Sequence, residues 1–186
     1  MVIARRTRDR IIETLWANDI SMRTEVWMIL DCARDPRIFG AVDGCYLDKT
    51  CLYSGDLPWQ LQMAAPYLVE LKKEDRFTAY VLDNGWGQSW GVFLRTETGM
   101  KTLRHHLRGF LRVRDTAGRR LLFRYYDPRV LRAYLPTCFP AELKTIYGPI
   151  DHFLMEAEEP GTMLEFGLDK FQLVEKRIPL EARASA

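Results

Sequence analysis

The sequence has no long apolar run, few cysteines and almost no histidine. No stretch reaches the roughly 18 consecutive apolar residues of a membrane-spanning helix, so we expect no membrane partner. Charged and polar residues follow Arg5 and Arg6, where a secretion signal needs an apolar segment, and the expected location is the cytoplasm. The 4 cysteines form no Cys-x-x-Cys pair, and none of the 3 histidines lies at metal-ligand spacing from them. We therefore expect free thiols, no metal and no cofactor.

The motifs of the common enzyme classes are missing as well. The sequence has no phosphate-binding loop, dinucleotide fingerprint, nucleophile elbow or His-Glu-x-x-His helix. No catalytic residue is assigned, and no small-molecule substrate is expected. The formal charge is only +2, from 27 basic and 25 acidic residues, which argues against a nucleic-acid partner.

What is present is typical of one packed domain: 186 residues, 47% hydrophobic and 28% charged. Strand and helix patterns alternate and hairpins follow, which predicts an α+β fold with a mixed β-sheet flanked by helices. We divide the chain into an N-terminal helix and lead-in (1–24), a core domain (25–166) and a short C-terminal helical extension (167–186). The predicted strands lie at 25–31, 66–71, 90–94, 111–114, 119–126 and 150–166 (a hairpin), and the predicted helices at 8–17, 76–83, 100–110, 168–176 and after Pro36, Pro128 and Pro140.

One predicted helix, over 100–110 and capped by Thr98, has a basic face. Its basic residues recur at helical spacing, opposite an apolar side that includes His106. The basic residues are Lys101, Arg104, His105, Arg108 and Arg112. One interpretation is a phosphoester-cleaving site in which His105 transfers a proton while Arg104 and Arg108 hold phosphate. The other, which burial statistics favour, is a solvated basic face with His106 as a satisfied core histidine.

A second candidate lies where the strand at 119–126 meets the next helix. Strand alternation places Arg124 among apolar neighbours on the face that also carries Tyr126, so its charge needs a carboxylate partner. Asp127 can cap the helix and still accept from Arg124 or Arg129. We interpret this corner as an Arg–Asp lock, with anchoring of a partner protein as the alternative.

Aromatic residues offer a third possibility. Trp86 and Trp90 bracket a glycine-rich segment, and Tyr125 and Tyr126 adjoin the arginines. Such side chains can stack on bases of single-stranded nucleic acid. Core packing is the favoured interpretation of the tryptophans, because large aromatic residues dominate cores.

Taken in order, several segments resemble the cytoplasmic effector adaptors, or effector chaperones, of the bacterial type VI secretion system. That family was first catalogued as a domain of unknown function. The segments are Leu30-Asp-Cys-Ala33, Leu52-Tyr-Ser-Gly55, Ala65–Leu71, Gly85-Trp86 with Trp90-Gly91, Leu103–Leu111 and Leu121–Pro136.

The resemblance implies a protein-binding role without catalysis. Such adaptors bind a cognate effector, often through its N-terminal or transthyretin-like region, and help to load it onto the VgrG spike. The family's hallmarks correspond here to Arg104, His106, Arg108, Arg124, Asp127 and Arg129. The residues expected to contact the partner are Arg104, His105, Arg108, Arg124, Tyr126, Asp127 and Arg129. Many relatives continue into a helical C-terminal lobe, which the short segment after 167 does not match.

The near-neutral total charge conceals an uneven distribution. Residues 101–132 contain ten basic and two acidic residues, a formal charge of +8, so the remainder carries −6. A basic patch of this kind can pair internally or receive an acidic partner. We expect the effector to bind in this region.

Overall fold

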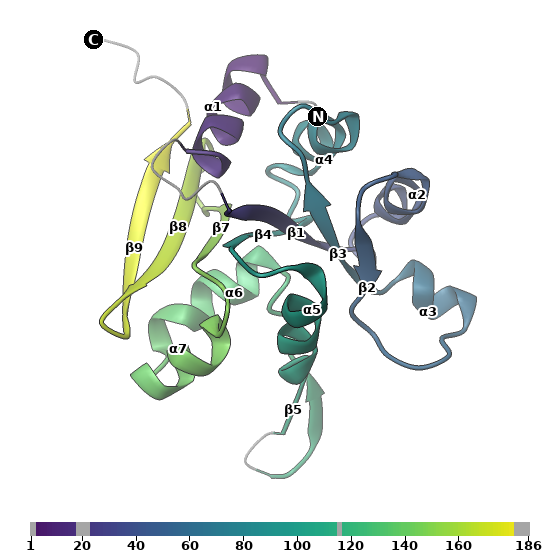
Figure 1. The fold of residues 1–186 in the computed structure, drawn as a ribbon, viewed down its shortest axis with the longest axis vertical. Coiled ribbons are helices and arrows are strands. Elements are labelled where there is room, and N and C mark those ends of the chain that lie inside the picture. The colour runs from purple at the N-terminus through teal and green to yellow at the C-terminus, as the bar shows by residue number, and fades with distance from the viewer. Residues whose placement is uncertain (1–2, 18–22, 115–116, 181–186) are drawn as a thin grey trace.

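A seven-stranded sheet forms the centre of the protein (Figure 1). The computed structural model describes residues 3–17, 23–114 and 117–180. The strand order is β2-β3-β1-β4-β7-β8-β9, and all neighbours pair antiparallel. The strands are β1 (Glu25–Asp31), β2 (Lys49–Cys51), β3 (Pro66–Leu71), β4 (Gly91–Thr96), β7 (His152–Glu156), β8 (Thr162–Asp169) and β9 (Gln172–Pro179). Strands β5 (Arg112–Arg114) and β6 (Arg120–Leu122) pair only with each other.

Helices cover both faces of this sheet. One apolar cluster joins α1, α2 and α4 to one face, and a second joins α5, α6 and α7 to the other. The helices are α1 (Arg5–Leu15), α2 (Pro36–Gly44), α3 (Trp59–Met63), α4 (Arg76–Gly85), α5 (Met100–Gly109), α6 (Pro128–Tyr134), the 3-10 turn η1 (Leu135–Thr137) and α7 (Pro140–Tyr147). None of the helices in the described ranges is long and apolar enough to cross a membrane.

The central strand β1 shows how the sequence positions the two clusters. Val26, Met28 and Leu30 belong to the first cluster, and Trp27 and Ile29 to the second. Successive side chains of a strand point to opposite faces, so both sets are buried when both faces are covered. This is why β1 is an uninterrupted apolar run rather than an alternating one.

The predicted α+β class, with one domain and a sheet between helices, is confirmed. Asp35, Asp75 and Asp127 cap α2, α4 and α6 through their side chains, which is the usual role of an aspartate just before a helix. In α2 and α6 the aspartate is followed by a proline at the first helical position. The sheet was predicted to be mixed, with parallel as well as antiparallel pairs, but each pairing in the structure is antiparallel. The cap predicted for Thr98 was also wrong, because α5 begins after Gly99 without a side-chain cap.

The predicted C-terminal helix was wrong too. Residues 162–179 form the β8–β9 hairpin, so the boundary placed after 166 falls inside β8. Lys170 and Phe171 make its turn with φ of 48° and 65°, a conformation usually signalled by Asn-Gly. Without that signal, the spacing of the apolar residues around the turn resembles the spacing in an amphipathic helix. The predicted segment's last residues, 181–186, lie outside the described residues.

Candidate functional site

Helix α5 carries the basic face, and its orientation follows from two leucines. Leu103 and Leu107 are fully buried in the second cluster, while His105 on the other side is exposed. The helix is therefore amphipathic in the predicted sense, and its basic side points away from the sheet's interior.

Arg108 nevertheless does not face open solvent. Its guanidinium donates to three consecutive carbonyl oxygens at the end of β2 and just after it: Cys51 (2.9 Å), Leu52 (3.1 Å) and Tyr53 (2.9 Å). One turn earlier, Arg104 lies 3.5 Å from the Thr50 hydroxyl. The basic face of α5 thus holds β2 and the loop after it, which strand pairing alone leaves with unsatisfied carbonyls.

The two histidines separate as predicted. The His106 Nε2 donates to the Ile146 carbonyl of α7 at 2.8 Å, and its ring contacts Phe110 edge-on. Burial lowers the pKa of His106, and the bond to Ile146 only partly opposes this. His106 therefore acts as a neutral link between α5 and α7, whereas His105 is exposed to solvent.

The corner after β6 differs from the predicted strand. β6 ends at Leu122, and residues 123–127 turn toward α6, so alternation does not reach Arg124. Arg124 is 43% exposed and donates to the Asp31 carboxylate at the end of β1, 2.5 Å away, while Asp127 lies 3.8 Å away. The bond to Asp31 raises the pKa of Arg124. The predicted carboxylate partner exists: Asp31 accepts the hydrogen bond of Arg124, and Asp127 is a second ion-pair partner at longer range.

Asp127 makes its closest contacts with Arg129. Its carboxylate accepts from the Arg129 backbone N–H (3.0 Å), Nε (3.0 Å) and Nη2 (2.6 Å). Burial raises the pKa of Asp127, but the bonds from Arg129 and the charges of Arg129 and Arg124 outweigh it, and the net shift is downward. The predicted lock therefore forms at the start of α6.

Two tyrosines fix the corner from inside. Tyr125 is fully buried and its hydroxyl donates to the Leu107 carbonyl at 2.9 Å, which satisfies an acceptor in the last turn of α5. Tyr126 is also buried, bonds to the Tyr53 side chain, and has the Arg124 guanidinium 6.0 Å from its ring centre. Burial raises the pKa of both hydroxyls, so both stay protonated.

These contacts unite segments that are far apart in the chain. We call the linked set the arginine corner: Asp31, Tyr53, Arg108, Arg124, Tyr126, Asp127 and Arg129. It joins the end of β1, the loop after β2, α5 and the start of α6 through hydrogen bonds and an arginine–aromatic contact. Five of the seven expected contact residues belong to the corner. The other two lie on α5, where Arg104 is one turn before Arg108 and His105 is exposed.

Asp31 and Tyr53 are members of the corner that no sequence pattern singled out as site residues. Both lie in segments that carry the family resemblance, yet neither was assigned a partner. The available signal was the apolar run over residues 26–30 that ends in aspartate, because a carboxylate buried at that point requires a cationic partner.

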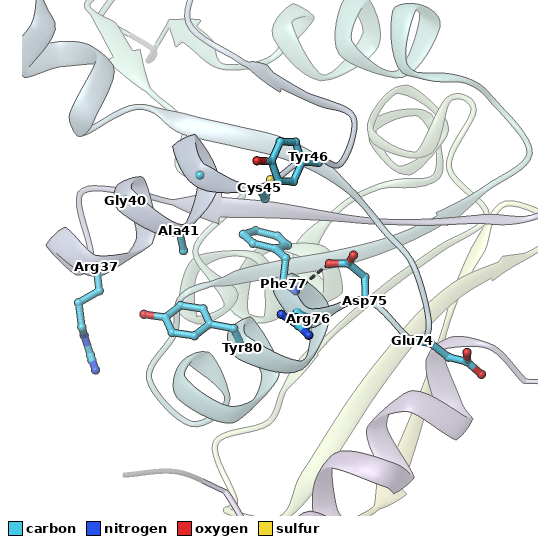
Figure 2. A pocket seen from close by; sticks show the side chains of 11 residues that line it. Arg37, Gly40, Ala41, Cys45, Tyr46, Glu74, Asp75, Arg76, Phe77 and Tyr80 are labelled. Carbon is cyan, nitrogen blue, oxygen red and sulfur yellow. Dashed lines mark hydrogen bonds between the residues drawn. The ribbon is translucent and has the colours of Figure 1, made fainter.

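The arginine corner lies apart from a large hollow of the protein. That hollow, of about 950 Å³, lies between α2 and α4. Figure 2 shows Phe77 and Tyr80 of α4 across from Gly40 and Ala41 of α2. None of the expected contact residues lines it. Small-molecule sites favour such concave apolar places. Arg129 lines a different hollow, of about 480 Å³, together with Ser89 and Glu156.

The arrangement gives Arg108 a different role from the one that the hydrolase interpretation assigns to it. Arg108 is occupied by backbone carbonyls, so it does not form a phosphate clamp with His105. Among residues 3–17, 23–114 and 117–180, no three histidine, cysteine or acidic side chains gather as a metal site. Trp86 and Trp90 pack in the first cluster, which agrees with their core assignment.

Comparisons with known proteins support one family assignment. Neither the curated proteins nor the solved structures contain a match to this chain. A family described as a domain of unknown function, DUF4123, matches residues 26–145. This stretch covers most of the chain and contains all members of the arginine corner, and the protein therefore belongs to the DUF4123 family.

Proposed function

We propose that the protein is a type VI secretion effector adaptor, which binds a cognate effector in the cytoplasm and helps to load it onto the VgrG spike without catalysis. The observation that carries this proposal is the convergence of the motifs. Four segments that resemble the adaptors, around residues 31, 53, 108 and 124–129, meet in the arginine corner. The resemblance therefore concerns one three-dimensional feature rather than scattered short matches.

The chemistry of the corner suits protein binding. Arg124 and Arg129 are 43% and 44% exposed, and each is held by a buried carboxylate. Their remaining N–H donors are fixed in position, so a partner's carboxylate or carbonyl oxygen binds them with little loss of side-chain entropy. Charged guanidinium donors form some of the strongest hydrogen bonds available to a protein surface.

The chain offers a matched control for testing this role. Asp35-Pro36-Arg37 at the start of α2 repeats the geometry of Asp127-Pro128-Arg129, with a carboxylate that accepts from the Arg37 backbone N–H, Nε and Nη2 at 2.9, 3.0 and 2.7 Å. Arg37 lies outside the arginine corner. Arg129→Ala and Arg37→Ala thus remove the same local interaction at two different places.

The experiment is affinity purification of tagged protein from its native lysate, with mass spectrometry and a toxin-delivery assay. We expect one large toxin, and VgrG, to accompany the wild type and the Arg37→Ala variant. Arg129→Ala should reduce toxin recovery by about tenfold, while circular dichroism shows a folded protein. Intact toxin delivery after deletion of the gene would contradict the proposal. Phosphoester turnover that depends on His105 would favour the hydrolase instead.

A further inference from the structure

The β5–β6 hairpin is a separate feature beside the arginine corner. Figure 1 shows it extending from the body beyond α5, away from the seven-stranded sheet. All its strand residues are exposed, including Val113, Leu121 and Leu122. An isolated two-stranded ribbon is marginally stable in water, so exposed apolar side chains on it call for a further partner.

The outer edge of β5 is available for pairing. The Phe123 N–H donates to the Leu111 carbonyl, which in this register makes Val113 and Leu121 a hydrogen-bonded pair. The backbone groups of Arg112 and Arg114 then point outward. In the part of the chain that the structure describes, they meet no backbone partner.

The side chains along this edge define what can bind it. The order is Arg112, Val113, Arg114, with the valine on one face and both arginines on the other. A strand added here places its own side chains beside them on the same faces. It therefore needs acidic residues opposite the arginines and an apolar residue opposite the valine.

We infer that the outer edge of β5 binds an extended segment of a partner protein, with alternating acidic and apolar residues, as an added strand. The β5 edge of a second copy is a poor occupant, because it would place arginines opposite arginines, and like charges directly opposite are destabilising. Arginines on an edge thus discourage self-association and favour an acidic strand. The inference rests on the proposed function only in identifying that partner as the effector.

The edge also adjoins the arginine corner. A small hollow of about 80 Å³ at the base of the hairpin is lined by Arg112 and Leu122 together with Tyr53 and Arg108 of the corner. One partner can therefore contact both features.

A matched pair of variants tests the edge. Arg112 and Arg120 are each the first residue of a strand, each has an outward backbone N–H, and each loses one positive charge on replacement. Proline is tolerated at a first strand position, and it removes the N–H. Arg112→Pro removes the outward donor from the β5 edge, whereas Arg120→Pro removes one from the β6 edge.

The probe is a short fluorescein-labelled peptide of alternating glutamate and valine, with the lysine–valine peptide as its control. We expect the glutamate peptide to bind wild type and Arg120→Pro alike, by fluorescence anisotropy, and Arg112→Pro about tenfold more weakly. Arg112→Glu keeps the N–H and should weaken binding of the glutamate peptide, because one of the two arginines on the edge is replaced by a like charge. Amide NMR should place the binding shifts at residues 112–114.

Several outcomes would overturn the inference: no binding of the glutamate peptide, equal weakening by both proline variants, equal binding of the lysine peptide, or self-association through this edge. The two proposals can fail separately. If Arg112→Pro and Arg112→Glu both recover the toxin normally, the edge is excluded while the adaptor role stands. If the peptide binds but wild type recovers no toxin, the adaptor role fails while the edge stands.

Discussion

Asp31 is the acidic residue that ties the arginine corner to the central sheet. It is 1% exposed, ends β1, and accepts from Arg124 and from the Ala33 backbone N–H at 3.2 Å. A buried carboxylate of this kind is stable only with its donors in place, and the donors depend on it in turn.

Asp31→Ala should therefore destabilise the protein by about 1–3 kcal/mol, the usual range for a buried hydrogen-bonded group that loses its partner. Urea unfolding measures the change. Asp35→Ala is the control at a partly buried N-cap, and about 1 kcal/mol is expected there. An unfolding midpoint for Asp31→Ala that equals the wild type's would show that the corner does not hold the fold.

His106 supplies a pH dependence whose sign is defined. Burial lowers its pKa below the ordinary value of 6.5, so the unfolded chain binds this proton more readily than the folded one. The stabilisation is complete above pH 6.5 and is lost as pH falls toward the lowered folded pKa. Thermal unfolding of wild type and His106→Gln between neutral and mildly acidic pH checks this. We expect the difference between the two proteins to shrink on acidification, and a constant difference would refute it.

At this scale the residue types of the site could be predicted from the sequence, but not all their partners. That Arg124 needs a carboxylate followed from its surroundings. The identity of this carboxylate as Asp31, 93 residues earlier in the chain, could not be predicted. β6 ends two residues before Arg124, so strand alternation does not set the direction of the Arg124 side chain. Tertiary pairing of this kind leaves no local signal.

The helix starts were the most predictable elements. Asp35, Asp75 and Asp127 each cap through a local hydrogen bond to a backbone N–H two residues on, and such contacts depend only on neighbours in sequence. The β8–β9 turn was not predictable, because Lys170 and Phe171 are not residues that favour positive φ.

Gly148 ends α7, and two independent features require glycine there. Its φ is 47°, and a Cβ at this position would collide with the His106 ring. Gly148→Ala should cost about 1–3 kcal/mol because it combines backbone strain with displacement of His106. Gly109→Ala is the comparison, since nothing lies within 4 Å of that Cβ and alanine favours the helix by about 1 kcal/mol. Thermal unfolding should move in opposite directions, and a shared direction would contradict this reading.

At the scale of the molecule, the charge asymmetry of the sequence is only partly balanced within the fold. Some of the positive charge in residues 101–132 pairs internally: Arg124 with Asp31 and Arg129 with Asp127. Among the described residues, Arg112 and Arg120 form no ion pair. Lys101, Arg104 and Arg108 on α5 form no ion pair within the described ranges either, so the uncompensated charge is spread over α5 and the hairpin, which charge counting alone does not indicate.

The pairing of β4 with β7 has a consequence for what counts as the smallest autonomous unit of this chain. The stretch that defines the family ends at residue 145, inside α7, whereas β7, β8 and β9 come later. A fragment cut there would leave β4 with an open edge and would remove Phe153, Met155 and Phe166 from the second cluster. The evolutionary module and the cooperative folding unit thus have different ends, and a soluble fragment must extend through β9.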